Sequence, residues 1–211
     1  MEILIYIVVL LFSVIIHEIA HGYMACIRGD DTAKLLGRLT LNPVPHLEFF
    51  GSILLPASLI ILHAPVIFGW AKPVPVNYAK LKNPKTDIPL ISFAGPMSNI
   101  MLAVISGTAI RIIHALPSFE QGFGGAISSV LFVMLVINVV LLIINLVPIP
   151  PLDGSKVITF FMPYDMARKY LNLNPFLCMM VLVVLLGTGI LWKIIGPLIK
   201  FSIVLLSGIA F

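Results

Sequence analysis

Long stretches without a charged residue dominate the sequence and restrict what the chain can fold into. A helix needs about 20 apolar residues to cross the hydrocarbon core of a membrane, which is roughly 30 Å thick. Within that core the backbone must satisfy its own hydrogen bonds, so each stretch should be mostly helical. We therefore predict an all-α polytopic membrane protein with about four to six membrane segments. The stretches that lack Asp, Glu, Lys and Arg are Ile3–His17, Phe49–Ala71, Ile88–Ile110, Gln121–Leu152 and Tyr170–Trp192.

The composition supports this prediction and excludes most other classes of protein. Hydrophobic residues make up 60% of the 211 residues and charged residues 10%, against about 45–50% and ~25% in soluble domains. A soluble globular domain, a collagen, a disordered tail and a disulfide scaffold are therefore excluded. The net charge of +4 is not gathered in a basic cluster with interleaved aromatic residues. We expect the lipid bilayer as a partner and no nucleic acid.

The N-terminal stretch is predicted to be a retained helix rather than a cleaved signal peptide. Glu2 precedes the apolar run without any Lys or Arg, and no small-residue cleavage site follows it. We expect this helix to extend from Ile3 to Ile27. The charged segments between the apolar stretches are short, so residues 1–211 are expected to form a single membrane-embedded domain.

Two segments between the apolar stretches are predicted to be extended. Residues alternate in polarity from Arg38 to Asn42, which favours a short strand. In Ala71–Asn77, Pro73 and Pro75 each push the preceding residue toward β or polyproline geometry. Short extended or β segments at the membrane face are therefore part of the predicted fold.

The sequence His17-Glu18-Ile19-Ala20-His21 places three ionisable residues inside the first apolar helix. Residues four apart on a helix lie about 40° apart around its axis, so His17 and His21 share one face. Two imidazoles at this spacing can bind one Zn²⁺, with Glu18 beside the metal as general base. A polar turn where the helix leaves the bilayer is the simpler alternative. Because ionisable residues inside a span are costly, we favour the metal site.

A catalytic zinc usually has three protein ligands and one open position, so a third ligand is expected elsewhere in the chain. Asp153 is the leading candidate. It follows Pro148, Pro150 and Pro151, which interrupt any helix, and interrupted backbone at membrane depth lines a cavity or is buried in protein. The alternative is that Asp153 caps a helix that begins near Ser155. The two histidines upstream favour the role of ligand.

Other polar residues of the apolar stretches receive weaker assignments. Asn99 could reach a polar group of the site. Small residues such as Gly95 and amides such as Asn99 commonly pack membrane helices together, however, and we favour that packing role. His63 is the alternative third ligand, whereas His46 and His114 lie in or beside loops and are expected to be solvated.

With these motifs the sequence resembles the site-2 proteases, which are intramembrane zinc metalloproteases. The resemblance rests on H-E-I-A-H at 17–21, G-P-M-S-N at 95–99 and N-L-V-P-I-P-P-L-D-G at 145–154. The order and spacing of the three motifs agree with the family. No PDZ or CBS domain is recognised in the chain, which therefore resembles a compact, bacterial branch of the family located in the cell membrane.

The resemblance also implies a role for each site residue. It implies one zinc per chain, held by His17, His21 and Asp153. Glu18 would be the catalytic acid and base, and Asn145 would contact the substrate or the developing oxyanion. The implied substrates are membrane-anchored proteins with transmembrane segments.

Two functions from different classes fit the sequence. The leading one is a zinc endopeptidase that hydrolyses membrane-anchored substrates within the bilayer, as in regulated intramembrane proteolysis. The alternative is a membrane metal-ion transporter or sensor that uses the His/Glu/Asp cluster as an ion site. A transporter is expected to carry ligands in series across the membrane, often in repeated halves, and no repeat is visible in the sequence. The protease is therefore favoured.

The positions of the site residues predict the path of Phe49–Ala71. The two histidines lie near the end of the first helix, and Asp153 lies just beyond Gln121–Ile149. Both helices should therefore run in the same direction, with an odd number of crossings between them. Because Ile88–Ile110 supplies one crossing, Phe49–Ala71 should enter and leave on the same side. Ten of the 13 Lys and Arg residues then lie on the active-site side, which predicts that this side faces the cytoplasm.

Overall fold

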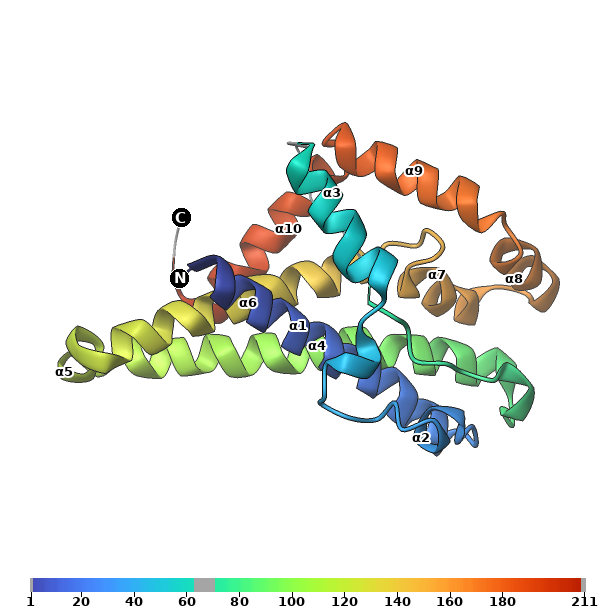
Figure 1. Cartoon of the computed structure of the whole chain (residues 1–211), viewed down its shortest axis with the longest axis horizontal. Helices are drawn as coiled ribbons and strands as arrows, with labels where there is room; N and C mark the ends of the chain where they lie inside the picture. Colours follow the sequence, from blue (N-terminus) through green and yellow to red (C-terminus); the bar gives the residue numbers. More distant parts are fainter. Residues whose placement is uncertain (1, 63–70, 210–211) are drawn as a thin grey trace.

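Three long helices, α1 (Glu2–Ile27), α4 (Pro84–His114) and α6 (Gly125–Asn145), form the centre of the fold. The computed structural model describes residues 2–62 and 71–209. α4 packs against both other helices and runs in the opposite direction to them (Figure 1). This arrangement confirms that the first and third of these helices run the same way, as the sequence argument requires. α1 also confirms the predicted N-terminal helix.

Four described helices are long and apolar enough to cross a membrane: Ile3–Ile27, Pro84–His114, Glu120–Asn145 and Ile190–Ser207. A fifth crossing is possible if the bent pair Tyr164–Leu171 and Pro175–Gly187 counts as one span. The described residues contain no strand. The chain is therefore an all-α polytopic membrane protein, as the sequence predicts.

Short helices connect and flank the long ones. They are α2 (Thr32–Leu35), a 3₁₀ turn at Val44–His46, a π-helix at Phe49–Leu54, α3 (Leu55–Ile61), a 3₁₀ turn at Tyr78–Lys80, α5 (Pro117–Phe119), a π-helix at Glu120–Gly124, α7 (Asp153–Val157), a 3₁₀ turn at Ile158–Phe161, α8 (Tyr164–Leu171), α9 (Pro175–Gly187) and α10 (Ile190–Ser207).

The strand predicted over Arg38–Asn42 is wrong. Ala71–Asn77, predicted to be extended, contains neither helix nor strand, and its last residue Asn77 has extended backbone angles (φ −95°, ψ 95°). Residues 38–42 form bends without a ladder partner. The guanidinium of Arg38 turns inward and donates to the carbonyl oxygens of Lys72 (2.9 Å) and Pro73 (3.3 Å). The alternation of polarity over residues 38–42 therefore reflects the burial of Arg38 and not a strand. In Ala71–Asn77, by contrast, the two prolines restrict the backbone directly.

The last apolar stretch also differs from the prediction. Tyr170–Trp192 is divided between α8, α9 and α10 rather than forming one helix. Gly189 adopts a left-handed conformation (φ 75°) between α9 and α10, and α8 meets α9 at a bend of 75°. Two of the three cations that the sequence argument assigns to the side opposite the active site, Lys193 and Lys200, lie within α10.

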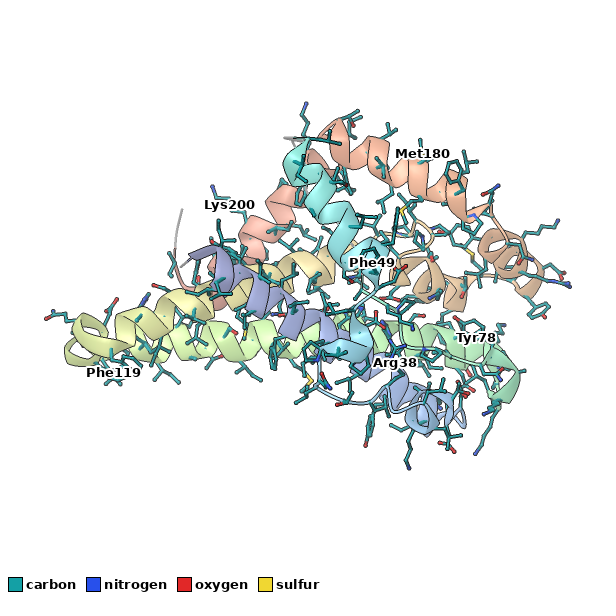
Figure 2. All side chains as sticks on the ribbon, viewed as in Figure 1. Arg38, Phe49, Tyr78, Phe119, Met180 and Lys200 are labelled. Carbon is teal, nitrogen blue, oxygen red and sulfur yellow. The ribbon has the colours of Figure 1, made fainter. Side chains whose placement is uncertain are left out.

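The core lies where α4, α6, α9 and α10 meet, and apolar side chains cover the outside. Arg111 near the end of α4 donates to the carbonyl oxygens of Leu205 (2.5 Å) and Leu206 (2.8 Å), which ties down the end of α10. Figure 2 shows outward side chains such as Phe49 and Met180, which are 71% and 46% exposed. Large exposed apolar surface is typical of a protein that faces lipid. The buried core residues are Ala103, Ile110, Leu135, Val139, Ile143, Leu182, Leu191, Ile195 and Ile203.

The residues that flank Phe49–Ala71, the segment predicted to enter and leave on one side, lie next to each other. The amide of Lys72 donates to the carbonyl oxygen of His46 at 2.9 Å, so the chain is closed just outside Phe49–Ala71. Its described part, 49–62, is a π-helix followed by α3, and this is too short to span the ~30 Å core alone. Residues 63–70, including the alternative ligand His63, lie outside the described residues.

Candidate metal centre

His17 and His21 lie on α1, and the groups that hold their rings lie on the facing helix α4. On α1, Ser13, His17 and His21 follow one another at intervals of four and share one face. The imidazole Nδ1 of His21 donates to the carbonyl oxygen of Ile91 on α4 at 2.7 Å. Two turns further along α4, Asn99 Oδ1 accepts from Nδ1 of His17 at 2.6 Å. Because α1 and α4 are antiparallel, the later histidine on α1 meets the earlier partner on α4, and each ring is fixed by its own acceptor.

Asp153 reaches the histidines from the other end of the chain. Its Oδ2 lies 3.1 Å from Nε2 of His17 and 3.1 Å from Nε2 of His21, and the two Nε2 atoms are 3.0 Å apart. The three side chains are only 8%, 12% and 12% exposed. Leu152 rather than Asp153 occupies the N-cap of α7, and no side chain caps that helix. The capping alternative is therefore wrong.

The donor set fits a metal cation. Both Nδ1 atoms face oxygen acceptors, so each neutral imidazole carries its proton on Nδ1 and a lone pair on Nε2. Two lone pairs and a carboxylate oxygen thus converge with no hydrogen between them. Ligand atoms around a tetrahedral zinc are separated by about 3.3 Å, close to the observed 3.0–3.1 Å. Among the described residues, this is the only group of three or more His, Cys, Asp or Glu residues that could hold a metal ion.

Gly95 leaves room for the imidazoles. A Cβ atom built at this position would lie 2.5 Å from Nε2 of His21 and 2.6 Å from Nε2 of His17. Any side chain would therefore occupy the space between the rings and α4. Gly154 is under similar constraint, because a Cβ there would overlap the carbonyl oxygens of Leu146 and Val147. Both glycines permit backbone to approach closely at the site.

We expect Gly95→Ala to lower zinc affinity strongly, because the new methyl group would displace both imidazole rings. Gly107→Ala is the matched control on the same helix. Its Cβ would also be crowded, at 2.9 Å from Leu206 Cβ, but far along α4 from the histidines. Both variants should lose roughly 1–3 kcal/mol of stability through overpacking, and only Gly95→Ala should lose zinc. Equal zinc affinities in the two purified variants would contradict this role of Gly95.

Glu18 contacts the segment that precedes the 3₁₀ turn at Tyr78–Lys80. Its Oε2 accepts a hydrogen bond from the backbone amide of Val74 at 2.7 Å. The side chain of Val74 also packs over Gly22, where a Cβ would lie 2.8 Å from Val74 Cγ1. The segment Lys72–Asn77, called the strap below, therefore lies across α1 one turn beyond Glu18.

Two further side chains hold the strap. Arg38 binds its first two carbonyl groups, as described above. Asp30, which is fully buried, accepts from the amide of Asn77 at 2.6 Å and from the amide of Thr32 at 3.0 Å. Burial alone would raise the pKa of Asp30, but the hydrogen bonds from Thr32 and Asn77 outweigh it and lower that pKa. Asp30 therefore stays ionised and anchors the strap at its C-terminal end.

The polar contacts given below for Asn145, His46 and His114 are to groups other than His17, His21 and Asp153. Asn145 ends α6 and its Nδ2 donates to the carbonyl oxygen of Leu141 at 2.9 Å, within its own helix. His46 is buried, at 1% exposure, and its Nε2 donates to the carbonyl oxygen of Thr40 at 2.9 Å, so the prediction that it is solvated is wrong. His114 is exposed, as predicted, and lies 3.4 Å from a carboxylate oxygen of Glu120.

Two residues of the site were missed by sequence reasoning, and one was undervalued. Asn99 was assigned to helix packing, yet it binds His17 directly. Asn138 and Ser13 extend this contact: Asn99 Nδ2 donates to Asn138 Oδ1 at 2.8 Å, and Asn138 Nδ2 donates to Ser13 Oγ at 2.9 Å. Ser13 lies four residues before His17, and Asn138 is an amide inside a charge-free stretch. Both features could have pointed to them.

Comparison with known proteins agrees with this site. Residues 107–187, which include the Asp153 motif, match Peptidase family M50. The chain is 38% identical over 198 residues to "Putative zinc metalloprotease YwhC" of Bacillus subtilis (strain 168), and the match covers 90% of this chain and 85% of YwhC. Rip2 proteins of Mycolicibacterium smegmatis and Mycobacterium tuberculosis, named likewise, are 28% and 31% identical over 144 residues. These matches cover 68% of this chain and 52% of each Rip2. No solved structure matches the chain significantly.

The fold and the comparisons together define a membrane-embedded protein of the zinc metalloprotease class. The chain belongs to Peptidase family M50, the site-2 protease family. Membership implies zinc as the metal, in agreement with the two imidazoles and the carboxylate gathered at one point.

Proposed function

We propose that the protein is an intramembrane zinc endopeptidase that cleaves membrane-anchored proteins in regulated intramembrane proteolysis. His17, His21 and Asp153 would hold one zinc per chain. The observation that carries the proposal is the convergence of their three ligand atoms within 3.1 Å, although Asp153 lies 136 residues from His17. Two of these side chains come from α1 and the third from the start of α7, and the burial of three polar ligand groups at one point is not explained by apolar packing.

Glu18 is the acid and base of the proposed reaction. Zinc, when bound, lowers the pKa of a coordinated water toward neutrality and polarises the scissile carbonyl. Glu18 is adjacent in sequence to one ligand and takes the proton of the attacking water, then returns it to the leaving amine. The hydrogen bond from Val74 to Oε2 orients its carboxylate and leaves Oε1 to exchange the proton.

Asn145 is proposed to stabilise the oxyanion that forms when the carbonyl is attacked. Its amide currently donates within α6, so a side-chain rotation must precede that contact. One donor to a developing oxyanion typically contributes about 10²–10³ in rate. Asn145 is the last residue of α6 and precedes Asp153 by eight residues in the sequence.

A substrate helix must unwind before its carbonyl groups become accessible. We propose that Leu36–Asn42, although it forms a turn and bends rather than a strand, and the strap bind the unwound segment through backbone hydrogen bonds. Leu41→Pro tests this, because Leu41 is 60% exposed and proline removes an amide donor without disturbing buried packing. We expect impaired cleavage with unchanged zinc content. The neighbouring Leu39 packs on Gly22 and is a poorer choice. Normal cleavage by Leu41→Pro would refute substrate binding by the backbone of Leu36–Asn42.

The active site is proposed to open toward the cytoplasm of a bacterial cell, with the N-terminus outside. Most Lys and Arg residues flank the end of the bundle that holds α2 and α8, opposite the chain termini (Figure 1). In a chain with Cys26 and Cys178 replaced, Ala79→Cys should resist a membrane-impermeant maleimide on intact cells. Gln121→Cys, which lies in the π-helix Glu120–Gly124 beyond the C-terminal end of α4, should be labelled. The reverse pattern would overturn the orientation.

Purified protein in lipid nanodiscs, mixed with single-span membrane proteins, tests the proposed function. We expect cleavage within the span, located by mass spectrometry of the products, and its loss on zinc chelation. Zinc uptake into sealed vesicles without cleavage of any substrate would instead favour the metal transporter. The single metal group among the described residues argues against that alternative, because a transport path needs successive sites.

A further inference from the structure

A chain of three buried polar side chains connects His17 to the backbone of α6. Asn99, Asn138 and Ser13 are each 0% exposed and come from α4, α6 and α1 respectively. We propose that Asn138 is a positioning residue: acting through Asn99, it fixes which ring nitrogen of His17 carries the proton. The inference rests on the proposed role of His17 as a zinc ligand.

The backbone of α6 sets the orientation of the Asn138 amide. Nδ2 of Asn138 donates to the carbonyl oxygen of Met134 at 2.8 Å and to Ser13 Oγ at 2.9 Å. A carbonyl group can only accept, so this side of the amide must be NH₂. The oxygen Oδ1 of Asn138 therefore faces Asn99.

This orientation passes from Asn138 to His17. Asn138 Oδ1 can only accept, so the atom of Asn99 at 2.8 Å must be the donor Nδ2. Asn99 Oδ1 is then left to face His17 Nδ1 at 2.6 Å. Nδ1 must carry the ring proton, and Nε2 keeps the lone pair that points at His21 and Asp153.

His21 needs no such relay, because its Nδ1 donates directly to the carbonyl oxygen of Ile91. At His17 the partner is an amide side chain, which could present either its oxygen or its NH₂ group. If Asn99 turned its NH₂ group toward His17, Nδ1 would accept and Nε2 would carry the proton. A protonated Nε2 cannot bind zinc. Asn138 is thus the residue that excludes the unproductive orientation.

The relay predicts specific effects of three variants on zinc affinity, measured by chelator competition. Asn138→Leu removes the acceptor for Asn99 and should weaken zinc binding about 10–100-fold, the usual effect of losing an outer partner of a ligating histidine. Asn99→Asp/Asn138→Leu should recover most of that affinity, because a carboxylate can only accept from His17 Nδ1. Ser106→Ala is the control: Ser106 is a fully buried α4 residue whose Oγ has no partner among the described residues.

The tautomer itself is measured by NMR of isotope-labelled histidine in the metal-free protein. We use about pH 8, above the ordinary histidine pKa of ~6.5, and assign His17 by its absence in His17→Ala. Wild type should show the Nδ1-protonated ring, and Asn138→Leu a substantial Nε2-protonated fraction. An Nε2-protonated ring in wild type would overturn the relay, even if Asn138→Leu does not fold.

The remaining outcomes separate this inference from the proposed function. Wild-type zinc affinity in folded Asn138→Leu would overturn the relay alone and leave the metal site intact. A double variant that folds but binds zinc no better than Asn138→Leu would likewise overturn it, since a merely structural defect is not corrected at Asn99. Failure of wild type to bind zinc would remove the proposed function, while the tautomer measurement would still decide the relay.

Discussion

Glu18→Gln is expected to abolish proteolysis while zinc binding stays at the wild-type level. Glutamine cannot take a proton from the attacking water, and general acid–base catalysis typically contributes about 10²–10⁴-fold. Its Oε1 can still accept from the amide of Val74, which holds Glu18 at 2.7 Å. The strap should therefore remain in place. Initial rates on a single-span substrate, together with zinc content, measure both effects.

Glu18→Ala is the informative companion to Glu18→Gln. It removes the acceptor for Val74 as well as the base, so the strap should loosen and the protein should become less stable. Similar melting temperatures for wild type and Glu18→Gln, with a lower one for Glu18→Ala, would separate the chemical from the structural role. Cleavage by Glu18→Gln at the wild-type rate would remove Glu18 from the reaction.

Asp153→Asn is expected to lose both zinc and activity. The amide is neutral and a poor metal ligand, and its NH₂ group would face two imidazole lone pairs if it turned toward them. Losing an outer partner costs about 10–100-fold in affinity, so the loss of a direct ligand should exceed this. Chelator competition on the purified variant measures the affinity.

Asp165→Asn is a suitable control for Asp153→Asn, because Asp165 is an exposed carboxylate on α8, away from the histidines. It should bind zinc as wild type does. Full zinc occupancy and full activity in Asp153→Asn would show that another residue is the third ligand, and His63 would be the first to test by substitution.

The spacing of residues predicted the parts of the fold and site that depend on one helix. Apolar length predicts α1, α4 and α6 because a membrane leaves the backbone no other way to satisfy its hydrogen bonds. The four-residue interval between His17 and His21 likewise places both imidazoles on one face. The contact between Asp153 and His17 joins residues 136 apart in the sequence. The prolines before Asp153, which interrupt the helix, were the feature that suggested it.

The features that were not predicted depend on contacts between helices. The sequence shows Asn99 as an amide in an apolar helix, and both packing and ligand support produce that pattern. Only the antiparallel register of α1 and α4 brings it to His17. Similarly, the burial of Arg38 and His46 follows from how the strap and the preceding loop fold over α1. A local alternation of polarity cannot reveal such partners.

Zinc titration of the metal-free protein in nanodiscs, with a single-span substrate present, tests the central claim most directly. Bound zinc and initial cleavage rate are measured together, alongside a variant that carries His17→Ala, His21→Ala and Asp153→Asn. The account predicts that the rate rises in proportion to bound zinc and reaches its maximum at about one zinc per chain, with neither binding nor cleavage in the variant. Cleavage independent of zinc, or equal zinc binding by the variant, would contradict it.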